Sequence, residues 1–268
     1  MKTLFLSLVL FATNSFAINY LAVSGDEYNS TARVVLTRNG NFYGFCSGVL
    51  IAPSVVLSAR HCAELNDIEF IILGTGGDHE ALEVDRVSTI DMPRSILNMY
   101  SESGELVYNS QVSESDYLVA TGKDLLIIHL KTASRFRPAQ IIPGTLYSFL
   151  QTAPLHFAGY PAMASGISEE SMWGIRIPTP VSTFTNCFYD NFNTRDLLLV
   201  TDCIALPGQS GGPLFATLGG QNYLVGIFSF GSSISQQVEI ISGRNFANTY
   251  TINLTNNSIL SFINRSLH

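Results

Sequence analysis

The sequence predicts an all-β protein, and three observations support this fold class. Short apolar runs rich in Val, Ile, Leu and Phe recur between clusters of Gly, Pro, Asn, Asp and Ser, which is typical of strands separated by turns. Hydrophobic residues make up 46% of the 268 residues and charged residues only 13%, which suits a large buried core. Helical spacing of apolar residues is missing until the C-terminus. These patterns leave a sandwich or a barrel as the architecture.

The N-terminal segment MKTLFLSLVLFATNSFA is expected to be a secretory signal peptide covering residues 1–17. Lys2 gives it a positive start, an apolar run follows, and Ser15, Phe16 and Ala17 form a small-x-small cleavage site. The apolar run is shorter than the roughly 20 residues that span a bilayer. We therefore expect residues 18–268 to be secreted or periplasmic, with no membrane contact after cleavage of the signal.

The strands are expected at apolar runs that follow one another along residues 32–254. Between them, Lys131 to Phe149 has fewer strand signals and contains two prolines, so it is a candidate crossing between two halves. Asp91 to Gly122 is longer and more polar, and we expect an extended loop there. The expected strands are ARVVLTR, CSGVLIA, SVVLSA, IEFIILG, DLLIIHL, LHFAGY, DLLLVTD, YLVGIFSF and NTYTINL.

The last segment, NNSILSFINRSL, predicts a short helix over about residues 257–266. An asparagine at its start can cap the helix. Helical spacing places four apolar side chains on one side, where they can pack on the body of the protein. They are Ile259, Leu260, Phe262 and Ile263.

The cysteines indicate disulfide bonds rather than a metal site. An even number of cysteines in an exported chain favours two disulfides, for which three connectivities exist. We expect the local pairing, Cys46 with Cys62 and Cys187 with Cys203. No Cys-x-x-Cys or His-x-x-x-His spacing occurs, so we expect no metal and no cofactor.

The stretch CIALPGQSGGPLF surrounds one hydroxyl, Ser210, with glycines and prolines. By itself it could be an ordinary surface loop. Attack of a hydroxyl on a carbonyl needs a base, a group that orients the base, and donors for the oxyanion. His61 and Asp124 can supply the first two. The backbone N–H groups of Gly208 and Ser210 can supply the third, because glycine tolerates the strained turn that aims them together.

Four stretches, in this order, resemble the trypsin/chymotrypsin-like serine protease family: LSARHC, KDLLIIHL, GQSGGPLF and LVGIFSFG. The resemblance implies two six-stranded antiparallel β-barrels within residues 18–268, an N-terminal barrel at about 32–135 and a C-terminal barrel at about 140–258. It also implies that His61, Asp124 and Ser210 form a catalytic triad where the barrels meet.

Two departures from the family pattern bear on activation and ancestry. In many animal members an aspartate precedes the serine and pairs with a new N-terminus after zymogen cleavage. Here Gln209 holds that position, so we expect no such switch. The stretches FAGYP and DCIALPGQSGG look more like the bacterial secreted branch of the family.

The resemblance also indicates which residues form the substrate cleft. It places Ile204 and Ala205 at the base of the primary pocket, where the missing acid disfavours cleavage after Lys or Arg. An apolar or small residue before the cut is expected instead. The strand with Phe228 would border the cleft, although Phe228 could equally be core. The other residues of this strand that we expect in the cleft are Ser229, Phe230 and Gly231.

The sequence thus predicts a secreted serine endopeptidase that acts on proteins or peptides through an acyl-enzyme. The alternative is a catalytically silent, protease-like binding protein whose cleft is covered, for instance by the segment at 91–122. A nucleic-acid partner is not expected, because the net charge is −7 and no Lys/Arg cluster is present. We expect the mature protein to be a monomer.

Overall fold

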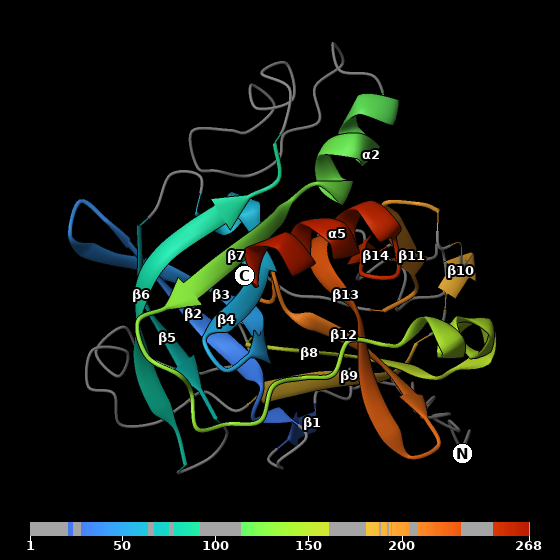
Figure 1. Cartoon of the computed structure of the whole chain (residues 1–268), viewed down its shortest axis with the longest axis horizontal. Helices are drawn as coiled ribbons and strands as arrows, with labels where there is room; N and C mark the ends of the chain where they lie inside the picture. The colour runs from blue at the N-terminus through green and yellow to red at the C-terminus, as the bar shows by residue number, and fades with distance from the viewer. Residues whose placement is uncertain are drawn as a thin grey trace, which may run out of the picture.

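Two β-sheet units lie side by side in the computed structural model (Figure 1). The expected signal peptide lies outside the described residues. Within the described part, no helix is long and apolar enough to cross a membrane. The structure describes residues 21–23, 28–63, 67–74, 78–91, 114–160, 181–187, 189–191, 193, 195–203, 208–231 and 249–267.

The first unit is a closed antiparallel barrel, as expected for the N-terminal half. The two-residue turn between its first two strands is formed by Asn39 and Gly40, whose φ values of 54° and 75° are those of a hairpin turn that matches strand twist. The strands follow the order β2 (Thr31–Arg38), β3 (Asn41–Ala52), β4 (Val55–Ala59), β7 (Leu125–Leu130), β6 (Glu80–Thr89) and β5 (Asp67–Leu73).

The second unit is an eight-stranded antiparallel sheet, whereas six strands were expected. The two additional strands are short and lie at the ends of the strand order, where β1 brings the N-terminal residues onto β9. The order is β1 (Leu21–Val23), β9 (Val181–Cys187), β8 (Leu155–Gly159), β12 (Pro213–Leu218), β13 (Gln221–Gly231), β14 (Thr249–Asn253), β11 (Leu198–Thr201) and β10 (Tyr189–Asn191).

The two units share a continuous hydrophobic core at their junction. Leu57 and Ile127 of the barrel belong to the same buried cluster as Phe215 and Ile227 of the second sheet. The connection between the units follows β7 and includes the 3-10 helix η3 (Gly144–Thr152). Because the junction is itself core, groups that meet there are held by packing on both sides.

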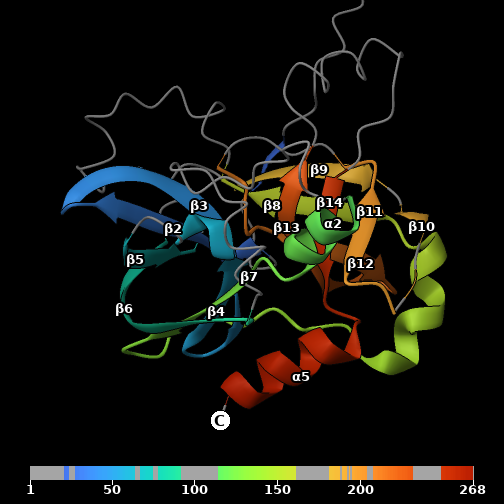
Figure 2. The same ribbon diagram turned by 90° about the horizontal axis from the view of Figure 1, so that it is seen from above.

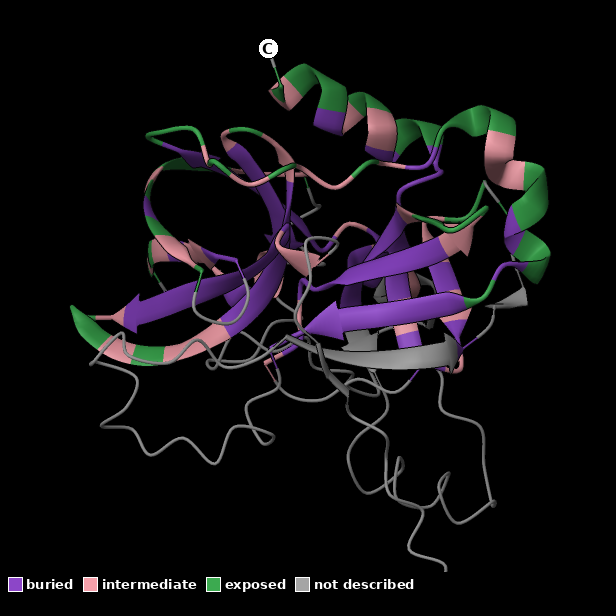
Figure 3. Ribbon diagram, turned by 90° about the horizontal axis from the view of Figure 1, so that it is seen from below, coloured by how far each residue is buried: buried purple, intermediate pink, exposed green. Residues whose placement is uncertain are grey.

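The C-terminal helix α5 (Asn257–Ser266) has the bounds expected from the sequence. The side-chain oxygen of Asn256 caps it by accepting hydrogen bonds from the backbone N–H groups of Ser258 at 2.9 Å and Ile259 at 3.4 Å. Ile259 and Ile263 are buried in the junction cluster, and the opposite face of the helix is exposed (Figure 3). The helix runs from the second sheet toward the barrel (Figure 2).

The expectation of an extended loop from Asp91 to Gly122 is wrong for its last part, which forms helix α2 (Glu114–Gly122). A short apolar stretch follows the polar start of this segment, and its residue Ala120 is buried in the interior. Gly122 fits so closely against Leu197 that a Cβ at this glycine would lie 2.5 Å from the Leu197 side chain. Contacts distant in sequence therefore fix a helix that local pattern alone does not predict. Residues 92–113 of the expected loop lie outside the described residues.

Burial of His156 in the second sheet predicts a loss of stability in acid. Its ring lies between Tyr28 and Phe215, and burial lowers the pKa of His156 to about 4. In the unfolded chain this histidine binds a proton near pH 6.5. Its contribution to the free energy of unfolding therefore falls as the pH is lowered from 6.5 to 4, and it does not change further below pH 4. The fall due to this group is about 3 kcal/mol by linkage. Urea unfolding across this pH range measures it.

The matched variant is His156→Gln, which removes the buried titrating group. It should flatten the pH dependence of the free energy of unfolding relative to the wild type. Equal pH dependence in both proteins would contradict this account of His156.

Candidate active site

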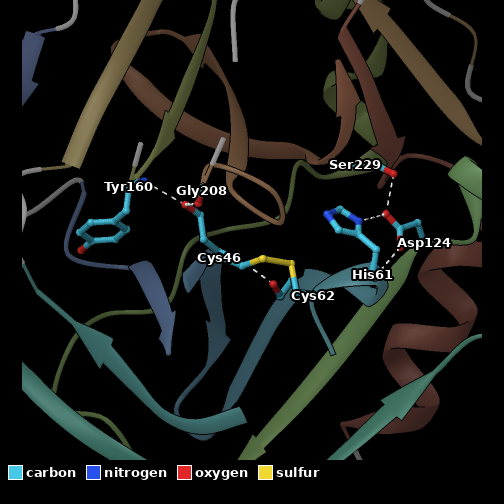
Figure 4. The surroundings of a disulfide bond; sticks show 9 residues. Cys46, His61, Cys62, Asp124, Tyr160, Gly208 and Ser229 are labelled. Atoms are coloured by element: carbon cyan, nitrogen blue, oxygen red, sulfur yellow. Dashed lines mark hydrogen bonds and ion pairs between the residues drawn. A yellow bond between two sulfur atoms is a disulfide. The ribbon is translucent and has the colours of Figure 1, made fainter. Parts of the chain in front are cut away.

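His61 and Asp124 meet because β4 and β7 are antiparallel neighbours in the barrel. Ala59 pairs with Leu125, so the residues just beyond β4 and just before β7 lie at the same end. His61 lies in the 3-10 turn η2 (Arg60–Cys62), and Asp124 directly precedes β7. Nδ1 of His61 lies 2.7 Å from Oδ2 of Asp124, and the backbone N–H of His61 donates to Oδ1 of the same carboxylate at 2.8 Å (Figure 4). One carboxylate thus holds both the ring and the main chain of the histidine.

The second sheet reaches the same carboxylate through Ser229 of β13. The Ser229 hydroxyl donates a 2.7 Å hydrogen bond to Oδ2 of Asp124 (Figure 4). Asp124 is 2% exposed and His61 17% exposed. A buried carboxylate needs such donors to offset the loss of water. The sequence placed Ser229 only at the border of the substrate cleft, because nothing in its spacing indicates a contact with a residue 105 positions away.

A disulfide holds the turn that carries His61. The Sγ atoms of Cys46 in β3 and Cys62 in η2 are joined, and their Cα atoms lie 6.3 Å apart (Figure 4). Sγ of both cysteines and a ring nitrogen of His61 lie within 4.8 Å of one another, which is a metal-like spacing. The cysteines are oxidised, however, and metal ligation needs the thiolate. In the second sheet, Cys187 is joined to Cys203.

Ser210 lies in a turn whose glycines permit an unusual backbone. Gly208 and Gly211 have φ values of 89° and 81°, in the left-handed region that favours glycine. The N–H of Gly211 donates to the carbonyl of Phe228 at 2.8 Å, and Ser47 N–H donates to the carbonyl of Ser210 at 2.7 Å. The turn is therefore bound to β13 on one side and to β3 on the other.

Gly211 also explains how closely this turn approaches the histidine. A Cβ at this glycine would lie 2.3 Å from the Ser47 carbonyl oxygen and 2.7 Å from the backbone nitrogen of Ala59. Ala59 is two residues before His61, so the close approach brings the Ser210 turn to the end of the barrel that carries the histidine. Ser210 itself is half-buried. Any larger residue at 211 would force the two units apart here.

The predicted cleft residues have different places in the structure. The side chain of Phe228 belongs to the core of the second sheet, where its ring contacts Phe157 edge-on at a centroid distance of 5.2 Å. Its backbone is hydrogen-bonded to Gly211 and Gly212, beside Ser210. Phe230 and Gly231 continue β13, opposite Tyr250 and Thr249 of β14. The predicted pocket residues Ile204 and Ala205 lie outside the described residues.

Comparisons with known proteins agree with this architecture. A bovine protein, chymotrypsin-like elastase family member 1, is 22% identical over 251 residues, covering 87% of this chain and 89% of the bovine protein. The solved structure of neuropsin, a serine protease of mouse brain, has a TM-score of 0.58 at 14% identity and covers 93% of this chain and 99% of the neuropsin chain. The structure of GrC has a TM-score of 0.59 at 14% identity, with 91% and 96% coverage.

The comparisons show the family of this chain, but they do not assign it to a branch of that family. The bovine and mouse proteins give no support to the expectation that the chain is closer to the bacterial secreted branch. The solved structures, at 14% identity, show a shared fold. The family model described as Trypsin matches residues 22–248, which is most of the chain. The chain therefore belongs to the trypsin family.

Proposed function

We propose that this chain is a secreted serine endopeptidase in which Ser210 is the nucleophile, His61 the general base and Asp124 the residue that orients the base. The observation that carries the proposal is the 2.7 Å contact between His61 Nδ1 and the buried carboxylate of Asp124. A carboxylate can only accept hydrogen bonds, so Nδ1 carries the proton. Nε2 is then left as the basic nitrogen, which is the tautomer a nucleophilic serine requires.

The proposed reaction has two halves that use the same groups. Nε2 of His61 takes the hydroxyl proton as Ser210 attacks the peptide carbonyl, and the resulting imidazolium is stabilised by Asp124. Backbone N–H groups of Gly208 and Ser210 stabilise the oxyanion. His61 then gives its proton to the leaving amine, and water releases the acyl group by the reverse sequence.

The proposed substrate is an extended peptide that lies beside β13 as an added strand. We propose cleavage after an apolar or small residue, with Ile204 and Ala205 at the base of the primary pocket. Neither side chain could pair with a basic residue of the substrate, so cleavage after Lys or Arg is disfavoured. Protein or peptide substrates follow from the protease family.

Secretion is proposed from the apolar N-terminal segment together with the two disulfides, which persist in oxidising compartments. None of the described residues favours the alternative, a silent binding protein. The 2.7 Å contact between His61 Nδ1 and Asp124 Oδ2 supports a catalytic role over a silent one.

Hydrolysis of a peptide library tests the proposed function directly. Replacement Ser210→Ala should lower the turnover by about 10⁶-fold, because the hydroxyl and its base act as a unit. Ser261→Ala, on the exposed face of α5, is the matched control and should retain wild-type turnover. Wild-type rates in the Ser210→Ala protein would remove Ser210 from the mechanism. The cleavage sites identified in the same library test the expected apolar or small residue.

Replacement Asp124→Asn should lower kcat by about 10⁴-fold with little change in KM. The amide would place a donor opposite Nδ1 of His61, which favours the tautomer that leaves no base for Ser210. Steady-state kinetics on a library-derived peptide, with circular dichroism to verify folding, measure the effect. A folded Asp124→Asn protein whose kcat falls less than about tenfold would contradict the orienting role of Asp124.

The buried amide of Gln209 predicts activity without a free N-terminus. Gln209 is 0% exposed and carries no charge that an α-ammonium group could neutralise. Protein with an N-terminal extension should therefore have the same kcat and KM as protein starting at residue 18. Active-site titration of both forms makes the comparison independent of purity. Strict dependence of activity on removal of the extension would show that a newly formed N-terminus is needed after all.

A further inference from the structure

We infer that Ser47 is a positioning residue of the proposed active site, because its hydroxyl holds the backbone of Gly208 and thereby fixes the turn that carries Ser210. The inference rests on the proposed function. Ser47 lies in β3 of the barrel and is 0% exposed. Its neighbour Cys46 faces the barrel core, so strand alternation turns Ser47 outward to the second sheet.

Two hydrogen bonds from Ser47 reach the turn on either side of Gln209. The Ser47 hydroxyl donates to the carbonyl oxygen of Gly208 at 2.9 Å, and the Ser47 backbone N–H donates to the carbonyl of Ser210 at 2.7 Å. These bonds fix two peptide planes of the turn from a residue of the other unit. The two bonded carbonyls belong to the peptide groups on either side of the one that carries the Ser210 N–H, so Ser47 holds the backbone around the proposed nucleophile and around this proposed oxyanion donor.

The hydroxyl of Ser47 is itself oriented by Tyr160. The backbone N–H of Tyr160 donates to Ser47 Oγ at 2.9 Å. A hydroxyl has a single hydrogen, and with an acceptor lone pair occupied by Tyr160 that hydrogen is directed to Gly208. The dashed line that leaves the Tyr160 backbone in Figure 4 marks this hydrogen bond to the Ser47 hydroxyl, close to the labelled Gly208.

Tyr160 is held by the barrel in turn. It is 1% exposed, and its hydroxyl lies 3.3 Å from the carbonyl oxygens of both Thr31 and Gly74, which share its single hydrogen. Burial raises the pKa of Tyr160 above its ordinary value, so the hydroxyl keeps its proton. Barrel carbonyls, Tyr160, Ser47 and the Gly208 carbonyl are therefore linked by hydrogen bonds into one series that ends at the turn carrying Ser210.

Glycine at 208 makes such a hold necessary. Glycine rotates more freely about φ and ψ than any other residue, so its φ of 89° is not maintained by its own sterics. Oxyanion donors act by being fixed before the reaction, and a donor that must reorient contributes less. Ala at position 47 would remove the partner of both the Gly208 carbonyl and the Tyr160 N–H. The turn would then relax away from the geometry that Ser210 needs.

The test compares Ser47→Ala with Ser58→Ala in the full mature protein. Ser58 is also 0% exposed and lies on the neighbouring strand, where its hydroxyl donates to the Ser47 carbonyl at 2.7 Å. Both variants lose one buried hydroxyl, but only Ser47→Ala releases the Gly208 carbonyl. We expect kcat of Ser47→Ala to fall by about 10- to 100-fold with KM nearly unchanged, since a misplaced group costs this much.

Two further readouts separate positioning from loss of stability. The affinity for a peptide boronic acid, which forms a tetrahedral adduct, should fall in parallel with kcat, because both depend on the oxyanion donors. Hydrogen exchange at the amides of Gly208, Gln209 and Ser210 should be faster in Ser47→Ala than in the wild type. Ser58→Ala should resemble the wild type in both measurements.

The exchange measurement also keeps this inference separate from the proposed function. A wild-type protein that hydrolyses no peptide would refute the proposed function, and the exchange rates would still show whether Ser47 holds the turn. Wild-type exchange in Ser47→Ala would overturn the inference. In an active enzyme, equal losses of kcat in Ser47→Ala and Ser58→Ala would also overturn it.

Discussion

The carboxylate of Asp124 is the group on which the rest of the candidate site depends. It is buried at the junction of the two units, where the barrel supplies His61 and the second sheet supplies Ser229. Burying a carboxylate is unfavourable unless donors surround it. The donors come from both units, so all hydrogen bonds to the carboxylate form only when the barrel and the second sheet are correctly packed against each other. The orientation of the histidine and the packing of the units are therefore parts of one arrangement.

The junction brings the catalytic candidates together through backbone as much as through side chains. The pairing of β4 with β7 places His61 beside Asp124. The disulfide between Cys46 and Cys62 holds the turn that carries His61. On the other side, Gly211 allows the Ser210 turn to come within contact of the Ala59 backbone. A shared hydrophobic core then keeps these approaches fixed, since interiors at crystal-like density leave little room for sliding.

Sequence reasoning reached the all-β class from local patterns of apolar runs and turn residues, whereas the barrel followed only from the resemblance to a known family. The apolar run that contains the strand Val55–Ala59 and the cap at Asn256 both follow from neighbouring residues in the chain. It missed α2, which depends on packing against distant residues, and it did not anticipate the two short strands at the ends of the second sheet. Strand pairs of this length have almost no signal of their own.

The same division holds for the candidate site. The residues proposed as nucleophile, base and orienting acid can be chosen from motifs, because their chemistry requires specific residue types. The supporting contacts of Ser229 and Ser47 cannot be predicted from motifs. Serine is common in proteins, and these contacts depend on partners 105 and 161 positions away in the chain. For Phe228 the sequence left the cleft and the core equally open, and its side chain belongs to the core of the second sheet.

The most direct test of an activated serine is the intact mass of the folded, disulfide-bonded protein after treatment with a fluorophosphonate. This reagent bonds to a serine oxygen only where a base removes the hydroxyl proton and donors stabilise the adduct. The account predicts a single adduct on the wild type and none on the Ser210→Ala protein. A folded wild type that stays unmodified, or a mutant that is still labelled, would contradict it.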